Sequence, residues 1–125
     1  LISTIAGVVI AQTGTSLPHG MGYHLTYFHN IAHGRANALL MKAYLEIYPN
    51  KERVDNILTC LGFKNLEELG KFIDDLLGEK EKVTKEEINA YAEDMVTNDL
   101  KLKNHPGKVT KKEFYIMYEK SLNVQ

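Results

Sequence analysis

The stretch HGMGYHLTYFHNIAHG, from His19 to Gly34, holds four of the five histidines of this 125-residue chain. It closes a segment of 34 residues that contains no Lys, Arg, Asp or Glu, and every charged residue lies from Arg35 onward. Charged side chains normally cover a solvated surface, so their absence predicts that this segment is buried. Buried imidazoles need partners, because an unpaired polar group away from water is costly. The candidates for a metal or catalytic site are therefore His19, His24, His29 and His33.

Length, charge and cysteine content restrict the class of protein. A chain of 125 residues is one domain at most. The net charge of −1 indicates neither a nucleic-acid partner nor an acidic tail. The single cysteine, Cys60, cannot form an internal disulfide, which favours a reducing compartment and a cytoplasmic protein. Cys60 lies in an apolar helical pattern and is predicted to be a small core residue.

The beginning of the chain is apolar and uncharged. Residues 1–11 are too few to span a bilayer and have no basic flank, so we expect no membrane association and predict a core helix. The chain also begins with Leu instead of Met. The uncharged start and the missing initiator together suggest a piece of a longer protein.

Helix signals recur along the whole chain, and no segment alternates with the period of two that is typical of strands. Capping residues precede most of the apolar runs, and glycine or proline follows them. The sequence therefore predicts an all-α bundle of about seven helices, the first three forming a buried layer and the last four a solvated one. The predicted helices span residues 2–12, 17–28, 31–48, 51–61, 66–77, 85–98 and 111–122, with Ser16, Asn30, Asn50, Asn65, Thr84 and Thr110 as caps and residues 104–107 as a turn.

Two arrangements of the histidines are compatible with a metal site. In one, His29 and His33 stand four residues apart on one helix and share a face. In the other, His19 and His33 lie on consecutive helices that fold back on each other, with Gly20 and Gly34 allowing close backbone approach. The second arrangement puts His33 in the first turn of its helix, where the positive helix end disfavours an imidazolium.

A third interpretation needs no metal. Two histidines are only half of a usual coordination shell, and the first acidic residue of the chain is Glu46. The four histidines could instead be partly buried and hydrogen-bonded to backbone carbonyls. Chemistry alone leaves these three arrangements open.

The motifs around the histidines resemble those of a known family. His19-Gly20-Met21-Gly22 is a histidine followed by small-Met-small, and fourteen positions after His19 comes His33-Gly34-x-Ala36-Asn37. The tail Asn104-His105-Pro106-Gly107 resembles the turn that precedes the final helix of the same family. In these features the chain resembles the C-terminal domain of iron-containing (group III) alcohol dehydrogenases over essentially its whole length.

The resemblance implies a fold, a cofactor set and a role for two histidines. It implies that residues 1–125 are the all-helical metal-binding domain of a two-domain oxidoreductase whose N-terminal dinucleotide-binding domain is absent here. By resemblance, His19 and His33 are two of the four ligands of Fe²⁺, or sometimes Zn²⁺, and an aspartate and a histidine upstream of Leu1 are the others. The full enzyme would transfer hydride between NAD or NADP, bound mainly by the other domain, and a small alcohol or aldehyde. The isolated domain is expected to be inactive, and a homodimer is one expected way to cover its uncharged face.

Other residues of the motifs receive more modest expectations. Tyr23 stands where many members of the family carry a histidine beside the nicotinamide; a phenol titrates near about pH 10, so a positioning role is expected instead of proton relay. His24 should face away from the ligands, and His29 should lie at the corner near the cleft. Asn37 is expected to brace its helix turn by hydrogen bonding, and His105 to be solvated.

A non-enzymatic helical binding module or scaffold with structural histidines is the alternative function. Its best support is an EF-hand-like pattern that starts at Leu102 and includes Asn104 and Glu113. The first position of such a loop needs a carboxylate where the chain has Leu102, and the fifth is Pro106, so calcium binding is not expected.

Overall fold

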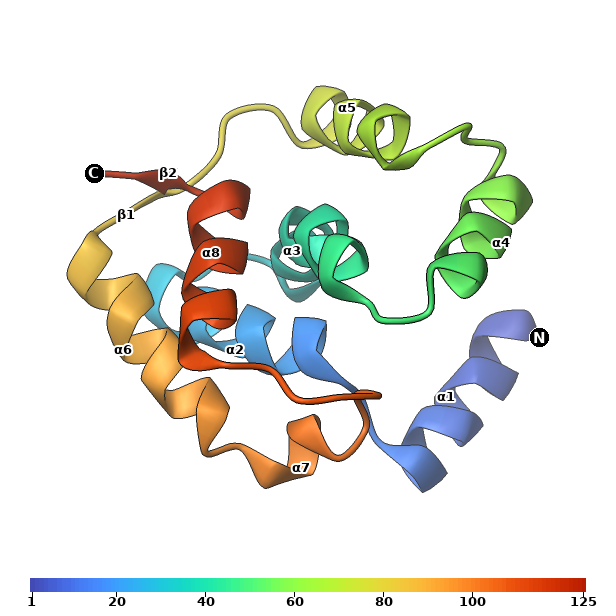
Figure 1. Ribbon diagram of the computed structural model, residues 1–125, viewed down its shortest axis with the longest axis horizontal. Helices are drawn as coiled ribbons and strands as arrows, with labels where there is room; N and C mark the ends of the chain where they lie inside the picture. The colour runs from blue at the N-terminus through green and yellow to red at the C-terminus, as the bar shows by residue number, and fades with distance from the viewer.

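The computed structural model describes all residues from Leu1 to Gln125 and has the predicted all-α class. Eight helices follow one another, and two strands of two residues each pair in parallel near the C-terminus (Figure 1). The helices are α1 (Ile2–Thr13), α2 (Leu17–His29), α3 (His33–Ile47), α4 (Lys51–Leu61), α5 (Leu66–Leu77), α6 (Lys85–Val96), α7 (Asp99–Leu102) and α8 (Lys111–Ser121), and the strands are β1 (Lys82–Val83) and β2 (Asn123–Val124).

The main core lies between α2, α3, α6 and α8, with α3 at the centre of the view in Figure 1. Leu17, Met21 and Leu25 of α2 are fully buried and recur every four residues, which is the spacing of one helix face. Phe114 and Tyr118 of α8 are also fully buried and lie in the same cluster. Burying each such side chain stabilises the fold by about 1.5–3 kcal/mol. This core holds α2 against α3, the two helices that carry the candidate histidines.

A second, smaller core joins α4 and α5 to the C-terminal half of α3. Its buried members are Leu45, Val54, Leu58 and Leu69. Cys60 is exposed, contrary to the prediction, because it lies two residues beyond Leu58 and so on the other side of α4.

The predicted caps are confirmed in the second half of the chain. Asn50 and Asn65 accept hydrogen bonds from the third amide of α4 and α5, respectively. Thr84 and Thr110 form capping boxes at the starts of α6 and α8 with Glu87 and Glu113. Each of these caps joins residues only three positions apart, so the sequence pattern is sufficient to locate it.

The start of α3 differs from the prediction. Asn30 is the C-cap of α2, in the left-handed conformation with φ of 54°, and α3 begins only at His33. Ser16 precedes α2 but its side chain makes no capping hydrogen bond. The position of His33 in the first turn of α3 is confirmed, and the sharp turn at Asn30 folds α3 back along α2.

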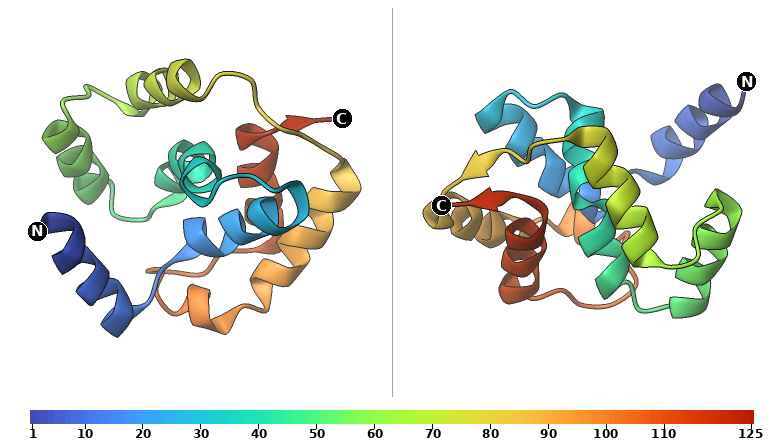
Figure 2. Two further views of the ribbon diagram at one scale, coloured as in Figure 1. Left: turned by 180° about the vertical axis from the view of Figure 1, so that it is seen from behind. Right: turned by 90° about the horizontal axis from the view of Figure 1, so that it is seen from above.

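The prediction of a buried N-terminal layer is wrong for α1. None of its residues is buried, and it projects from the rest of the molecule (Figure 2). The side-chain amide of Asn104 ties its end to the bundle by donating to the carbonyl oxygens of Thr13 and Thr15, at 3.1 and 3.0 Å. An uncharged segment is buried only where a second surface packs against it. The main core is formed by residues of other helices and includes none from α1. None of the helices combines the length and the apolar character that a membrane crossing requires.

Candidate metal centre

The rings of His19 and His33 lie together at the corner between α2 and α3. His19 is the third residue of α2 and His33 is the first residue of α3. Their ring centroids are 5.1 Å apart and their planes meet at 64°. His19 is half-buried and His33 is exposed, so one ring is set into the corner and the other borders solvent. Two imidazoles at this separation are suitable as neighbouring ligands of one cation.

Gly20 and Gly22 of α2 leave room for side chains from other elements. A Cβ atom at Gly22 would clash with Oδ1 of Asn37 on α3, and one at Gly20 would lie 2.9 Å from Cγ of Lys101 on α7. Gly34 has open space around it, so the expected close approach at that glycine is not observed. Gly22, within the His-Gly-Met-Gly motif, therefore gives space to the Asn37 side chain that contacts His33.

The surroundings of His19 favour its neutral ring. Burial, followed by repulsion from His33 and Lys101, lowers the pKa of His19 below its ordinary value of 6.5. His33 is oriented by Asn37, whose side-chain nitrogen lies 3.1 Å from Nε2 of His33, one turn along α3. The Asn37 amide can meet this nitrogen in two ways. If its nitrogen donates, Nε2 of His33 accepts and the only lone pair of the neutral ring is occupied. If its oxygen faces the ring, Nε2–H donates to it, the otherwise unpartnered Oδ1 of Asn37 is satisfied, and Nδ1 keeps the lone pair that a metal ligand must offer.

Tyr23 packs on the histidine pair. Its ring is stacked on that of His33, with centroids 5.3 Å apart and planes 15° from parallel, and the side chain is about half exposed. The ammonium group of Lys101 lies 5.2 Å from the centroid of the Tyr23 ring and donates to Oγ1 of Thr15 at 2.5 Å. Sequence reasoning missed Lys101, because a residue of α7 gives no signal of its contact with α2.

The first turn of α3 is fixed by Arg35. Its guanidinium donates to Glu81 at 2.5 Å and to the carbonyl oxygens of Leu77 and Glu79 at 2.6 Å each. These three bonds join the first turn of α3, which begins at His33, to the end of α5 and the segment that leads to β1.

The histidine pair alone does not make a metal site. No group of three or more His, Cys, Asp or Glu side chains in the chain is placed to hold a metal ion. Imidazole nitrogens suit Fe²⁺ or Zn²⁺, but a structural or catalytic site needs more donors than these two.

Comparison with known families identifies the family of the chain. Residues 1–122 match the model of the Fe-containing alcohol dehydrogenase family, C-terminal. The chain belongs to that family. Searches of curated proteins and of solved structures give no significant match. The Fe-containing alcohol dehydrogenase family consists of oxidoreductases that use iron and NAD(P), and its full enzymes contain an N-terminal domain.

The other histidines of this alcohol dehydrogenase domain have separate partners. His24 faces away from the pair, as expected: Nδ1 lies 2.9 Å from the hydroxyl of Tyr118, and Nε2 lies 2.9 Å from Asp94. Because the Tyr118 hydroxyl donates to the carbonyl of Met21, its oxygen accepts from His24. Both ring nitrogens of His24 therefore have partners, and the side chain joins α2 to α6 and α8 instead of lying with the histidine pair.

The arrangement of His29 and His33 on one helix is not observed. His29 ends α2, and its Nε2 lies 3.2 Å from the hydroxyl of Tyr91 and 3.3 Å from Glu87. Burial, followed by Glu87, raises the pKa of Tyr91 to about 12. The hydroxyl thus remains protonated at neutral pH. The break at Asn30 separates the two histidines into different helices, so their spacing of four residues does not place them on one helix face.

His105 is buried, contrary to the expectation of solvation. Its Nδ1 lies 3.4 Å from the hydroxyl of Tyr44, and its ring contacts those of Tyr44 and Tyr48 at centroid distances of 5.7 and 5.8 Å. Burial lowers the pKa of His105. The turn at residues 104–107 is polar in sequence, but it packs between α3 and the link from α1 to α2, which no local pattern indicates.

Proposed function

We propose that this chain is the metal-binding helical domain of an iron-dependent alcohol dehydrogenase, in which His19 and His33 supply two of the ligands. The observation that carries the proposal is the juxtaposition of their rings at 5.1 Å, across fourteen residues of sequence. The family match and the lowered pKa of His19 support it. The remaining ligands, an aspartate and a histidine, would come from the N-terminal domain.

The metal would supply Lewis-acid chemistry, polarising the oxygen of a small alcohol or aldehyde during hydride transfer with NAD or NADP. The chain's own residues prepare the site for this task. Burial of His19 keeps a lone pair available, and Asn37 fixes the ring orientation of His33. The half-exposed ring of Tyr23 stacks on His33 and can help to position a ligand beside the pair.

A partner domain is part of the proposal. The apolar helix α1, which has no buried residue, and the exposed His33 support docking of an N-terminal dinucleotide-binding domain on this chain. Without that domain the chain has neither a coenzyme site nor a full ligand set, so the isolated domain should be inactive. The proposed location is the cytoplasm, and the full enzyme is proposed to be a homodimer.

Metal analysis of the full-length protein tests the ligand assignment. His19→Ala and His33→Ala should each abolish iron retention after gel filtration, as measured by elemental analysis. His29→Ala is the matched control and should retain most of the iron, because His29 is bonded to Tyr91 and Glu87. Equal loss from His29→Ala would contradict the assignment.

Activity of the isolated chain tests the domain assignment. The 125-residue chain, supplied with Fe²⁺ and either coenzyme, should give no hydride transfer in a spectrophotometric assay, while the full-length enzyme turns over. Turnover by the chain alone would show that the ligands and the coenzyme site lie within it.

The calcium-binding alternative receives no support from the geometry. The carboxylate of Glu113 accepts from the amide and hydroxyl of Thr110 at 2.7 and 2.8 Å and so closes a capping box. A bidentate calcium ligand at that position would have to break this cap.

A further inference from the structure

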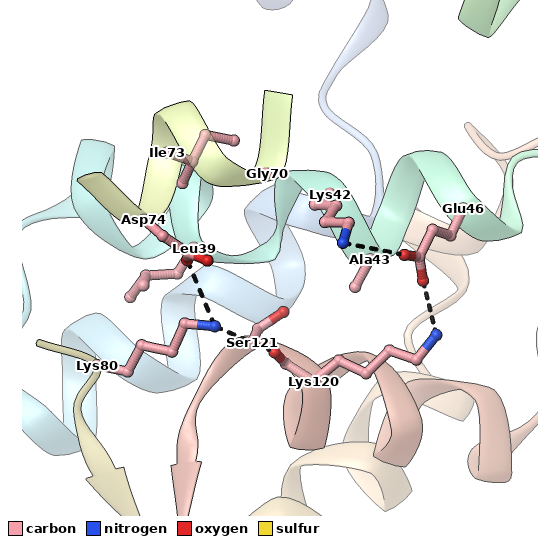
Figure 3. A pocket seen from close by; sticks show the side chains of 10 residues that line it. All are labelled: Leu39, Lys42, Ala43, Glu46, Gly70, Ile73, Asp74, Lys80, Lys120 and Ser121. Atoms are coloured by element: carbon pink, nitrogen blue, oxygen red, sulfur yellow. Dashed lines mark hydrogen bonds and ion pairs between the residues drawn. The ribbon is translucent and has the colours of Figure 1, made fainter. Parts of the chain in front are cut away.

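A polar cavity of about 350 Å³ lies between α3, α5 and α8, away from the histidine pair. Four residues of α3 line it at the spacing of one helix face, while His33 and Asn37 lie on another face of the same helix. The lining residues are Leu39, Lys42, Ala43, Glu46, Gly70, Ile73, Asp74, Lys80, Lys120 and Ser121 (Figure 3).

Three lysines enter this cavity from three separate elements. Lys42 comes from α3, Lys80 from the segment between α5 and β1, and Lys120 from α8 (Figure 3). Lys42 and Lys120 share one carboxylate, that of Glu46, at 3.8 and 2.7 Å. The cavity lining thus holds three ammonium groups and two carboxylates, those of Glu46 and Asp74. A third carboxylate, that of the exposed Glu67 at the rim, forms an ion pair with Lys42 at 2.8 Å.

Lys80 is the least well paired of the three. Its nearest acceptors are Asp74 and the carbonyl oxygen of Lys120, both at 3.4 Å. An ammonium group normally makes shorter bonds with its acceptors. Lys80 therefore has donor capacity directed at the cavity that nothing in the protein satisfies well.

The hydroxyl of Ser121 provides an independent indication of a ligand. The residue is 3% exposed, lines the cavity, and its Oγ has no hydrogen-bond partner. A buried hydroxyl without a partner is costly, so such a group usually meets a bound molecule or water. Figure 3 shows Ser121 beside Lys80 and the backbone of Lys120.

Gly70 leaves room for the side chain of Lys42 to reach the cavity. A Cβ atom at Gly70 would lie 2.5 Å from Cδ of Lys42, so the lysine stem crosses α5 where that helix has no side chain. Leu39, Ala43 and Ile73 give the cavity an apolar part beside its cationic part.

We propose that this cavity binds the phosphate group of a small phosphorylated metabolite, with Lys80 and Ser121 as its main contacts. Lysines that converge from three directions, together with one hydroxyl, match the several oxygens of a tetrahedral dianion better than the two oxygens of a planar carboxylate. The apolar part of the cavity accommodates the organic portion. The site is independent of the metal centre and of the proposed dehydrogenase reaction.

Binding of simple anions to the full-length protein tests the proposal. Isothermal titration with inorganic phosphate and with glycerol phosphate, at constant ionic strength, should show saturable binding. Lys80→Gln and Ser121→Ala should each weaken it by about tenfold, the effect of losing one bond to a charged group. Lys71→Gln is the matched control: Lys71 is an exposed α5 lysine paired with Asp75 outside the cavity, and its loss should leave affinity unchanged.

Three results would overturn the proposal. The first is no saturable phosphate binding by the unaltered protein. The second is equal weakening by Lys71→Gln, which would reveal non-specific charge attraction. The third is succinate binding as tightly as glycerol phosphate, which would refute phosphate selectivity. Unchanged circular dichroism spectra and melting temperatures of the variants ensure that lost binding reports the site and not the fold.

Discussion

His19 and His33 face each other across the α2–α3 corner with ring centroids 5.1 Å apart, although fourteen residues separate them in sequence. The turn at Asn30 folds α3 back along α2, and Gly22 leaves space for the Asn37 side chain beside His33. Asn37 and Tyr23 then contact His33 on two sides. These neighbours determine how precisely the pair can hold a cation, and they can be tested separately from the ligands.

Asn37→Ala should weaken metal binding without removing a ligand. The amide of Asn37 orients the ring of His33, and loss of such an orienting bond typically lowers metal affinity by about 10–100-fold. Competition with a chelator of known affinity measures this in the full-length enzyme. Asn56→Ala, an exposed change on α4, is the control and should leave affinity unchanged. An unaltered affinity in Asn37→Ala would contradict the orienting role.

Tyr23 should act through its ring and not its hydroxyl. Tyr23→Phe keeps the stacking on His33 and the contact with Lys101, so kcat/KM of the full enzyme should stay near the original value. Tyr23→Ala loses the stacking, worth about 0.5–1.5 kcal/mol, and should lower kcat/KM by about two- to tenfold. If Tyr23→Phe is as impaired as Tyr23→Ala, the hydroxyl has the main role.

Glu87 should stabilise the fold in a pH-dependent manner. The backbone amide of Thr84 is the largest influence that lowers the pKa of Glu87, with its hydroxyl and His29 adding to the effect. A carboxyl with a lowered pKa in the folded state contributes stability above its unfolded value of about 4.5, and this is lost as pH falls through the folded value. Because the side chain is 38% exposed, solvent screening limits the contribution.

The variant Glu87→Gln isolates that contribution. At pH 7 and low salt it should unfold more easily, by about 0.3–1 kcal/mol, the range for a charge at a helix N-terminus. The deficit should disappear in urea titrations at a pH below the folded pKa of Glu87. Glu86→Gln removes a charge from the same first turn of α6 but no hydrogen bond to Thr84, so it controls for the general effect of charge and should cost less stability. A deficit that persists at low pH would contradict the charge-based explanation.

His105 should make the protein less stable in mild acid. Burial lowers its folded pKa, so the unfolded chain takes up a proton first as pH falls below about 6.5. Stability contributed by the neutral ring is therefore complete above that pH and is lost on acidification. His105→Gln should show a smaller loss of unfolding free energy between about pH 7.5 and about pH 5.5 than the original protein. Parallel pH profiles would show that His105 does not titrate on unfolding.

Local signals predicted much of the fold, and non-local packing accounts for the differences. The boxes at Thr84 and Thr110 need only residues three positions apart, and both were predicted with the helices they begin. Asn30 was predicted as an N-cap, but the same side chain also tolerates the left-handed conformation that ends α2. The four-residue helix α7 and the paired strands β1 and β2 are too short for any periodicity to indicate.

In the candidate site, too, local motifs could be predicted and contacts between distant segments could not. The motifs at His19 and His33 identified the residues that meet at the corner, but Lys101 reaches Tyr23 from a distant helix and Asn104 reaches the end of α1. Apolar composition predicted burial of α1, whereas burial depends on the surface available to pack against it.

Anomalous diffraction at the iron edge, from crystals of the full-length enzyme grown with Fe²⁺, would locate the metal relative to the two histidines. We expect one strong peak within about 2.0–2.2 Å of a ring nitrogen of both His19 and His33. A peak bound to His29 or His24, or to only one member of the pair, would contradict the ligand assignment.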